Sequence, residues 1–328
     1  MLDLLYAQAA GARRRYYERR PGARRRLQQP VISVGNLSVG GTGKTPLVAA
    51  IAERLLERGE RPAILSRGYR RRVRVDGAVV VSDGTNLLST VDLAGDEPLM
   101  LAARVRGAAV IVGEDRHLAG ALAERQFGAT VHVMDDGFQH VQLARDLDIL
   151  VTRAGEIGTG RTLPFGRLRE SPRAAARADL LVVVDADGPT AKAEAWALGI
   201  SQAVAARRTI ASSPAPDQPV IAIAGIGDPS QFFAMLTAAG YAVRDTLAFA
   251  DHHRYTARDV SRIVACARGA GTDAVLTTEK DAVRLTALGA VPFRVVPVPM
   301  TLAIEDWPSL DAAISAALDR ARQPHSPL

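Results

Sequence analysis

The feature that most constrains this fold is a series of short apolar runs that alternate with helical patterns. Seven runs qualify as strands: Val31–Gly35, Ala63–Ser66, Ala78–Ser82, Ala109–Gly113, Thr130–Met134, Leu147–Thr152 and Leu180–Asp185. Most are apolar throughout, as expected for a parallel sheet that is buried on both faces. Helical patterns such as Thr45–Arg58 and Asp115–Arg125 lie between several of them. This alternation predicts an open, doubly wound α/β sheet.

A polar, proline-containing stretch interrupts the alternation. Residues 211–219 read ASSPAPDQP, which is typical of a linker. After it, VIAIAGIGDPSQFFAML restarts a strand–turn–helix unit and DAVLTTEKDAVRL gives another. We therefore expect a larger α/β domain over residues 27–210, a linker over 211–218 and a smaller α/β domain over 219–328. Residues 1–26 form a separate N-terminal arm.

The positive charge of the chain is concentrated in this arm. The 328 residues carry a net charge of +6, and residues 1–26 contain eight arginines against Asp3 and Glu18, which accounts for all of it. A nucleic-acid-binding protein would instead spread basic residues over a folded face, so we expect no nucleic-acid partner. The hydrophobic content of 48% is that of a soluble globular protein. The single cysteine, Cys266, excludes a disulfide within the chain.

The arm combines an apolar helical stripe with its arginines. Leu2, Leu5, Tyr6 and Ala9 fall on one helical face. The apolar part is far shorter than the ~20 residues of a membrane-spanning helix. The arginines follow it, whereas in a secretory signal they would precede it. The pattern favours contact of residues 1–26 with an anionic membrane surface. Docking of the helix on its own domain is the alternative.

The stretch SVGNLSVGGTGKTPLVAAI, residues 33–51, joins the first expected strand to the first expected helix. It ends like a phosphate-binding loop, although Ser38 stands where the pattern G-x-x-x-x-G-K-[ST] has its first glycine. Backbone N–H groups of such a loop and the helix N-terminus bind phosphate oxygens. Lysine reaches the β and γ phosphates, and threonine ligates Mg²⁺. The nucleotide site is expected at Ser38, Val39, Gly40, Gly41, Thr42, Gly43, Lys44 and Thr45.

Two adjacent carboxylates follow a later strand. In VHVMDDGFQH, Asp135 and Asp136 lie at the carboxyl end of a strand, where open α/β sheets bind ligands. A P-loop enzyme needs an acidic residue there to hold Mg²⁺. An Asp-Gly turn is the structural alternative.

Other polar clusters stay ambiguous from their local sequence. Asp96 and Glu97 precede a proline at a helix start, which suits an ordinary acidic first turn or a general base. His252 and His253 suit acid–base or phosphate-contact work, or a polar loop before a helix cap at Thr256.

Arginines in two loops could bind phosphate. The loops are LSRGYRRR, which contains Arg67, and PFGRLRE, which contains Arg167, Arg169 and Glu170. Arginines that follow apolar segments can clamp a phosphate or a sugar phosphate. Because arginine is abundant in this chain, these positions are weak as isolated features.

The motifs carry more weight together. VGNLSVGGTGKTP, LSRGY, GDEP, DDGFQH, GRLRE, FADHH.Y and TTEKDAVRL, in this order and after the arm, resemble the tetraacyldisaccharide 4′-kinase (lipid A 4′-kinase) family. The resemblance runs from residue 1 to about residue 305, and the family is similarly degenerate at the position of Ser38. It implies transfer of the γ-phosphate of ATP, with Mg²⁺, to the 4′-hydroxyl of a tetraacylated glucosamine disaccharide 1-phosphate.

The resemblance also implies an architecture and a location. The fold would be two α/β/α domains, P-loop and Rossmann-like, the larger with a mostly parallel sheet. A two-stranded linker would join them, with the active site in the cleft between. The protein would sit peripherally on the cytoplasmic face of the inner membrane of Gram-negative bacteria, and we expect a monomer.

Site residues follow by motif. The resemblance makes Asp96 of GDEP the catalytic base, with Lys44 on the phosphates. It makes His252 of DHH, from the other domain, the partner that raises the basicity of Asp96. The metal ligands would be Thr45, Asp135 and Asp136. The remaining positions near the nucleotide, the metal or the reacting groups are Arg67, Gln139, His140, Arg169 and Glu170.

Two other classes of protein stay open at this stage. One is a nucleotide-switch ATPase that cycles on and off membranes through its arm, although such a protein has no evident need for the DHH domain. The other is a soluble P-loop kinase or ligase for a small metabolite, which would not need residues 1–26.

Overall fold

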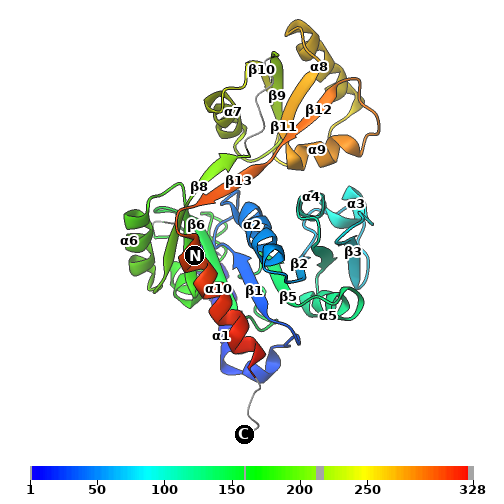
Figure 1. Cartoon of the computed structure of the whole chain (residues 1–328). Coiled ribbons are helices and arrows are strands. Elements are labelled where there is room, and N and C mark those ends of the chain that lie inside the picture. Colours follow the sequence, from blue (N-terminus) through cyan, green and yellow to red (C-terminus); the bar gives the residue numbers. More distant parts are fainter. Residues whose placement is uncertain (1, 159, 212–217, 324–328) are drawn as a thin grey trace.

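The computed structural model describes residues 2–158, 160–211 and 218–323, which form two sheets with helices on both sides (Figure 1). The strands of one sheet are β1 (Val31–Gly35), β2 (Pro62–Ser66), β3 (Ala78–Asp83), β4 (Ala109–Gly113), β5 (Val131–Asp135), β6 (Leu147–Arg153), β7 (Leu180–Val184), β8 (Ala203–Ile210) and β13 (Met300–Ile304). Their order is β13-β8-β7-β6-β1-β5-β2-β4-β3. We call the elements around this sheet the larger domain.

The central strands of the larger sheet are parallel and buried. β1 pairs in parallel with both β5 and β6, and every residue of β1, β2, β4, β5 and β7 is buried. This burial explains why these segments are apolar throughout. Only the two edge strands of the sheet, β3 and β13, pair antiparallel to their neighbours. All seven strands expected from the sequence are present, and the predicted α/β fold class is confirmed.

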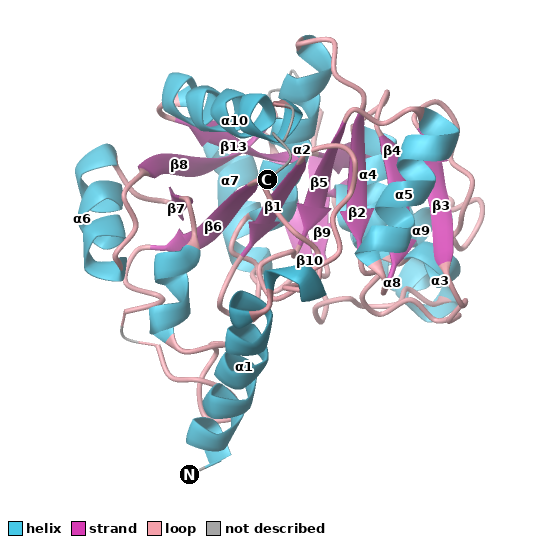
Figure 2. Cartoon of the chain, turned by 90° about the horizontal axis from the view of Figure 1, so that it is seen from below, coloured by secondary structure: helices cyan, strands magenta, loops and turns pink. Residues whose placement is uncertain are grey.

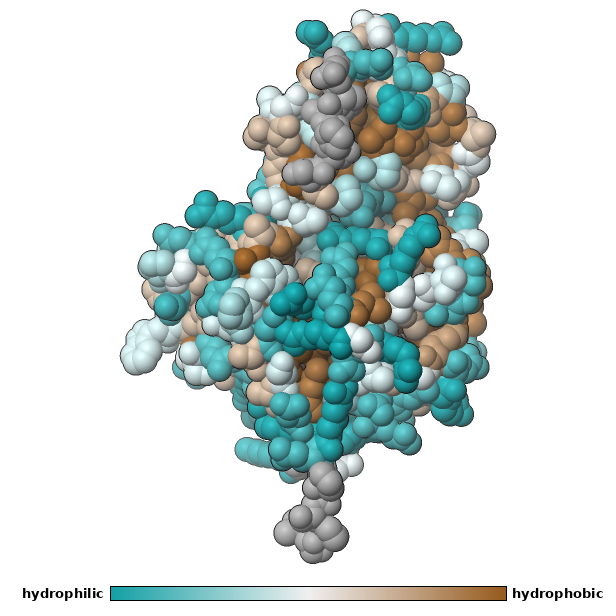
Figure 3. All heavy atoms as spheres, in the orientation of Figure 1, coloured by the Kyte–Doolittle hydropathy of each residue, from teal (hydrophilic) through white to brown (hydrophobic). Residues whose placement is uncertain are grey.

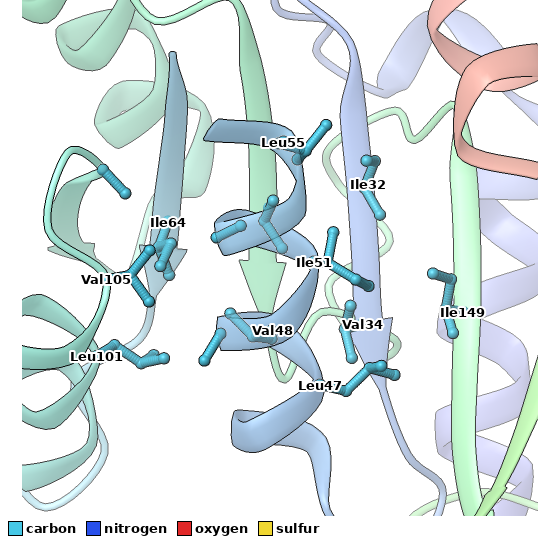
Figure 4. Close-up of a cluster of buried hydrophobic side chains, with 14 of the residues drawn as sticks. Ile32, Val34, Leu47, Val48, Ile51, Leu55, Ile64, Leu101, Val105 and Ile149 are labelled. Atoms are coloured by element: carbon cyan, nitrogen blue, oxygen red, sulfur yellow. The ribbon is translucent and has the colours of Figure 1, made fainter. Parts of the chain in front are cut away.

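Helices cover both faces of this sheet (Figure 2). They are α2 (Lys44–Glu57), α3 (Val91–Ala94), α4 (Asp96–Arg104), α5 (Arg116–Phe127), α6 (Gly188–Leu198) and α10 (Trp307–Arg322), with a 3-10 turn η2 (Pro172–Arg177). On α2, Leu47, Ile51 and Leu55 are fully buried and lie beside Ile32 and Val34 of β1 (Figure 4). Each such side chain contributes about 1.5–3 kcal/mol by burial. Packing of α2 therefore fixes the loop that precedes it.

The smaller domain is built on a second, all-parallel sheet. Its strands are β9 (Val220–Ala224), β10 (Val243–Ala248), β11 (Ala274–Thr278) and β12 (Arg294–Val298), in the order β10-β9-β11-β12. Alternate residues of β9 face opposite cores: Ala222 packs with Phe232 of α7 (Pro229–Ala238), and Ile223 packs with Ile263 of α8 (Ala257–Gly269). The remaining helix is α9 (Glu279–Thr286), whose Leu285 joins the α8 side.

The C-terminal boundary expected for the smaller domain is wrong. β13 pairs antiparallel with β8, and Leu302 and Ile304 of β13 join the core of the larger domain. Leu310 and Ile314 of α10 lie in the same core. The chain thus enters the smaller domain after β8 and returns through β13, so residues 300–322 belong with the larger sheet. Reading the sequence in order misses this return, because β13 and α10 look like one more strand–helix unit.

Two expected segments lie largely outside the described part of the chain. The linker predicted at 211–218 includes residues 212–217, which the structure does not describe, and β8 with β13 form the two-stranded connection that it does describe (Figure 1). The arm contains α1 (Leu2–Arg19) and a short turn η1 (Pro21–Ala23). The side chains of Leu2, Leu5, Tyr6 and Ala9 lie outside the described residues, so the apolar stripe stays a prediction.

In Figure 2, α1 extends away from the sheets. Across the ranges that the structure describes, none of the helices is both long and apolar enough to span a bilayer. On the face shown in Figure 3, the larger domain presents mainly hydrophilic side chains.

Candidate active site

A cleft of about 1250 Å³ is lined by loops of the larger domain and by residues of the smaller one. The smaller domain contributes His252, from the loop after β10, and Lys280 of α9. Ser38 and Asp96 do not line the cleft but lie buried beside it, with 2% and 7% exposure. The other predicted site residues all line it: Val39, Gly40, Gly41, Thr42, Gly43, Lys44, Thr45, Arg67, Asp135, Asp136, Gln139, His140, Arg169, Glu170 and His252.

The backbone of the phosphate loop is fixed by glycine conformations and by hydrogen bonds from two arginines. Gly43 has φ 100° and caps α2, and Gly40 has φ 119° with the Arg167 side chain so close that a Cβ would lie 2.3 Å from its Nη2. Arg167 donates to the carbonyl oxygen of Val39 at 2.8 Å, and Arg153 donates to that of Gly41 at 3.1 Å. Glycine is required at Gly40 and Gly43, since a side chain there would be strained.

The position of Ser38 does not require glycine, because the chain is extended at that point. Ser38 forms an antiparallel bridge with Leu168. The N–H of Val39 donates to the carbonyl of Arg167 at 2.8 Å, and the N–H of Arg169 donates to that of Leu37 at 2.6 Å. An L-residue adopts such an extended conformation without strain. The same pairing brings the GRLRE segment beside the loop.

A network of charges joins the loop to the DDGFQH segment. Lys44 Nζ lies 3.6 Å from Asp136 Oδ1, and Arg169 Nη1 donates to Asp136 Oδ2 at 2.6 Å. Burial alone would raise the pKa of Asp136, but Lys44 and Arg169 outweigh it and hold this pKa below its ordinary value. Gln139 completes the group, since its Oε1 lies 3.3 Å from Arg169 Nη1 and its Nε2 donates to the carbonyl of Asn36 at 2.9 Å.

Asp135 has an unsatisfied carboxylate. It is 3% exposed, and its Oδ1 has no hydrogen-bond partner among the described residues. Burial, Glu97 and Asp136 together raise the pKa of Asp135 well above its ordinary value. A buried carboxylate in this situation is stabilised by a cation. Its neighbour Asp136, with the Thr45 hydroxyl at the start of α2, offers the further oxygens that such a cation needs.

These residues fit Mg²⁺ bound together with phosphates. The described residues contain no cluster of three or more His, Cys, Asp or Glu side chains that would form a complete protein cage. Mg²⁺ is commonly held by one or two carboxylates, with substrate phosphates and water as its other ligands. Thr45, Asp135 and Asp136 match that requirement.

Asp96 and His252 meet across the two domains. Asp96 is the first residue of α4, and its Oδ2 lies 2.9 Å from Nδ1 of His252. Asp96 Oδ1 accepts from the N–H of Glu97 at 2.9 Å, so Asp96 is also part of an ordinary acidic first turn. Burial would raise the pKa of Asp96, but His252, Lys280 and Arg284 hold it well below its ordinary value. The expectation that His252 raises the basicity of Asp96 is therefore wrong, because its hydrogen bond stabilises the carboxylate and lowers this pKa.

The two adjacent histidines have different surroundings. His252 lines the cleft, whereas His253 stacks on Phe249 with ring centroids 4.8 Å apart and lies 3.1 Å from Asp259 Oδ2. His252 has φ 59°, a left-handed conformation that is unfavourable for a residue with a side chain. Among the described non-glycine residues, positive φ angles occur also at Arg70, Asp136 and Asp185, and the first two line the cleft. Such strain is typical of functional sites.

Glu170 is occupied by the N-terminal arm. Arg14 of α1 donates to both of its carboxylate oxygens, at 2.7 and 2.8 Å, and both residues are 5% exposed. Arg14 also donates to the carbonyl of Phe138 at 2.9 Å. Arg25 and Arg26 pair with Asp115 and Asp146. Part of the arm therefore docks on its own domain, the alternative that its sequence left open.

The side chain of His140 lies in the same region and is neutral. Burial, with Arg116 and Arg145 nearby, lowers the pKa of His140 to about 3. Arg116 is 3% exposed and its Nε has no partner within the described residues. His140 is thus neutral at physiological pH, and the positive charge of this wall comes from arginine.

Comparison with known proteins decides the family. A family model described as tetraacyldisaccharide-1-P 4′-kinase matches residues 1–319. This chain belongs to that family. A tetraacyldisaccharide 4′-kinase of Geobacter sulfurreducens is 41% identical over 326 residues, which covers 96% of this chain and 90% of the relative. One of Geobacter metallireducens is 43% identical over 272 residues, 80% of each chain.

A solved structure of the family is also similar. The crystal structure of LpxK from Aquifex aeolicus, described as an "apo" form in complex with ATP, has a TM-score of 0.77 and 31% identity. The match covers 97% of each chain. It extends over both domains of the present structure.

Several residues of the site were not predicted from the sequence. Arg14 was one arginine among eight in the arm, and nothing local distinguished it. Arg153, at the end of β6, had no motif around it. Lys280 and Arg284 lay in the TTEKDAVRL segment, which contributed to the family resemblance but was given no role. That segment was the available signal.

Proposed function

We propose that this protein transfers the γ-phosphate of ATP to the 4′-hydroxyl of a tetraacylated glucosamine disaccharide 1-phosphate. Family membership, the names of the relatives and the ATP bound to the Aquifex aeolicus protein support an ATP-dependent lipid A kinase. The observation that carries the residue assignments is the meeting of Asp96 and His252 at the edge of the cleft that also holds Lys44, Asp135 and Asp136.

The phosphate loop forms the donor half of the site. Its backbone and the N-terminus of α2 bind the phosphates, while Lys44 offsets their charge. Arg67 and Arg169, both in the cleft lining, supply further positive charge. When bound by Thr45, Asp135 and Asp136, Mg²⁺ supplies charge neutralisation at the β and γ phosphates.

Asp96 and His252 form the acceptor half. The acceptor 4′-oxygen forms a bond to the γ-phosphorus, the bond from that phosphorus to the β–γ bridging oxygen breaks, and ADP leaves. Asp96 takes the hydroxyl proton. A carboxylate with a low pKa suffices, because the hydroxyl becomes strongly acidic once the bond to phosphorus has begun to form. His252 orients Asp96 through their shared hydrogen bond.

An ion pair lines the cleft near Asp96. Asp96 does not itself line the cleft, whereas Glu97, Lys280 and His252 do, and Lys280 Nζ lies 2.8 Å from Glu97 Oε1. In this scheme the acceptor hydroxyl reaches Asp96 once that ion pair moves aside. The pair thereby excludes water from the base until the acceptor enters.

The arm reaches the same cleft. Ala10, Arg13, Arg14 and Arg25 all line it. A tetraacylated acceptor has its chains in a bilayer, so the arm would meet the membrane while the sugar enters the cleft. This supports a peripheral membrane protein, which we place on the cytoplasmic face because the family resemblance implies it. We keep the expectation of a monomer.

The test is phosphorylation of the acceptor. Purified protein with ATP, Mg²⁺ and tetraacyl disaccharide 1-phosphate should yield the bis-phosphate. Protein that binds ATP but makes no product would refute the proposal. ATP turnover without acceptor, together with ATP-dependent membrane residence, would instead indicate the switch ATPase.

Removing residues 2–9 distinguishes the lipid kinase from a soluble P-loop kinase for a small metabolite. This deletion keeps Arg14 and its contacts with Glu170, so it removes only the start of the arm. The lipid kinase should lose activity on vesicle-embedded acceptor, with partitioning onto anionic vesicles reduced in parallel. A soluble small-molecule kinase would stay fully active.

A further inference from the structure

We propose that Arg284 of α9 is the positioning residue that fixes the carboxylate of Asp96 for the reaction. The proposal rests on the proposed function, in which Asp96 accepts the proton. It assigns a role to a residue of the smaller domain that does not line the cleft and therefore acts through Asp96. Arg284 is 7% exposed, which makes a solvent-facing role for its guanidinium untenable.

Three donor atoms converge on one oxygen of Asp96. Arg284 Nε donates to Asp96 Oδ2 at 2.9 Å, Arg284 Nη2 contacts the same oxygen, and His252 Nδ1 lies 2.9 Å from it. The guanidinium is planar and rigid, so two of its nitrogens on one oxygen restrict both the position and the rotation of the carboxylate. One histidine bond alone would leave the carboxylate free to turn about it.

The other oxygen of Asp96 is left for the substrate. Within the described residues, Oδ1 accepts only from the backbone N–H of Glu97. A carboxylate oxygen has capacity for a second donor. The clamp on Oδ2 therefore selects Oδ1 as the oxygen that receives the acceptor hydroxyl.

Arg284 is itself held rigidly. Its Nη1 donates to the carbonyl of Gly225 at 2.9 Å and to Asp281 Oδ1 at 2.9 Å. Asp281 is fully buried, and its Oδ2 accepts from the N–H of Gly225 at 2.9 Å and from Thr278 Oγ1 at 2.7 Å. Gly225 follows β9 and Thr278 ends β11. The position of Asp96 is thus tied to the core strands of the smaller sheet.

The charges around Asp96 come from both domains. His252, Lys280 and Arg284 approach it from the smaller domain, while Glu97 is its neighbour on α4. Asp281 faces Arg284, and Asp251 lies 3.8 Å from His252 Nε2. An opposite charge within about 4–6 Å lowers the pKa of a carboxyl group by about 1–3 units. Loss of Arg284 should therefore raise the pKa of Asp96.

The experiment compares Arg284→Met, Arg284→Lys and Arg104→Met in the full-length protein. Arg104 is the matched control: it lies on α4 and reaches across the same interface to Glu279 of α9, with Nη1 3.7 Å from Oε2, away from Asp96. For each variant, kcat, both KM values, the pH profile of kcat and Tm are measured with ATP, Mg²⁺ and the acceptor.

Arg284→Met should lower kcat about 100-fold or more through misplacement of the base, with each KM changed less than about threefold. The acid limb of its kcat profile should move up by about one pH unit or more. Arg284→Lys keeps the positive charge but loses the two-nitrogen contact of the planar guanidinium. The acid limb of its kcat profile should therefore stay near that of the wild type, while its kcat falls to an intermediate value. Arg104→Met should leave kcat and the limb near those of the wild type.

An unchanged acid limb in Arg284→Met, or a limb in Arg284→Lys that moves as far as in Arg284→Met, would overturn the inference. Equal losses of kcat in Arg284→Met and Arg104→Met would do so too, because they would indicate a general interface defect. If Arg284→Met fails to fold, a wild-type kcat in Arg284→Lys would refute the clamp. A wild type that makes no bis-phosphate would refute the proposed function instead.

Discussion

Arg14 of the N-terminal helix and Glu170 of the cleft form a buried, two-point ion pair. Glu170 directly follows Arg169, which contacts Asp136. The segment that is expected to meet the membrane is therefore attached next to the residues that are expected to meet phosphate and metal.

Arg14→Ala should loosen the arm and destabilise the protein. It leaves the buried Glu170 carboxylate without its partner, and breaking a buried ion pair from one side costs about 3–5 kcal/mol. Chemical denaturation should show this loss, and limited proteolysis should cut within α1. The exposed Arg15 serves as control, and Arg15→Ala should behave like the wild type. Equal stability of the two variants would contradict the anchoring role.

Lys44→Met should abolish most of the activity while the fold persists. In the proposed mechanism Lys44 offsets the charge that develops on the phosphates, and loss of one such group lowers kcat about 100- to 1000-fold. The measurement is kcat under saturating ATP, with Tm as the check on folding. A kcat within about tenfold of the wild type would argue against its role.

Asp135→Asn should be more stable than the wild type in the absence of Mg²⁺. The substitution removes a buried carboxylate that lies near Asp136 and Glu97 and has one oxygen without a hydrogen-bond partner in the described part of the chain. It should also reduce the stabilisation that Mg²⁺ with ATP gives to the wild type. Differential scanning calorimetry with and without Mg²⁺–ATP measures both effects. An unchanged response to Mg²⁺ would place the metal elsewhere.

His252→Ala should shift the pH dependence of the reaction. The hydrogen bond from His252 helps to hold the pKa of Asp96 below its ordinary value, so in the proposed mechanism activity should be fully present at neutral pH and lost only in acid. Without His252 this pKa rises, and the loss should begin at higher pH. His252→Asn, which can still donate a hydrogen bond, should shift the profile less. Identical profiles for the two variants would refute this reading.

The sequence predicted most of the larger sheet and the loop between β1 and α2, because both depend on local patterns. Strand β1, the glycines at 40 and 43 and the helix α2 are adjacent in the chain, so their geometry follows from short-range rules. The Asp96–Arg284 contact joins residues 188 positions apart. No local pattern encodes such a pair, and only the family resemblance drew Asp96 and His252 together.

The return of the chain through β13 was missed for a related reason. A strand pattern shows that a segment is extended but does not say which sheet it joins. β13 follows four parallel strands of the smaller domain in the chain, yet it pairs with β8. The deciding information is the burial of Leu302 and Ile304 in the core that α2 also joins, which is a property of the assembled protein.

This return has a consequence for synthesis of the protein. Domains generally fold one after another as they leave the ribosome, beginning at the N-terminus. Here the first domain to be translated lacks its edge strand β13 and the helix α10 until almost the whole chain has emerged. The smaller domain, which is continuous between β9 and β12, is translated in full first and should fold before its host. A chain that ends near residue 299 should therefore contain a folded smaller domain beside an incomplete larger one.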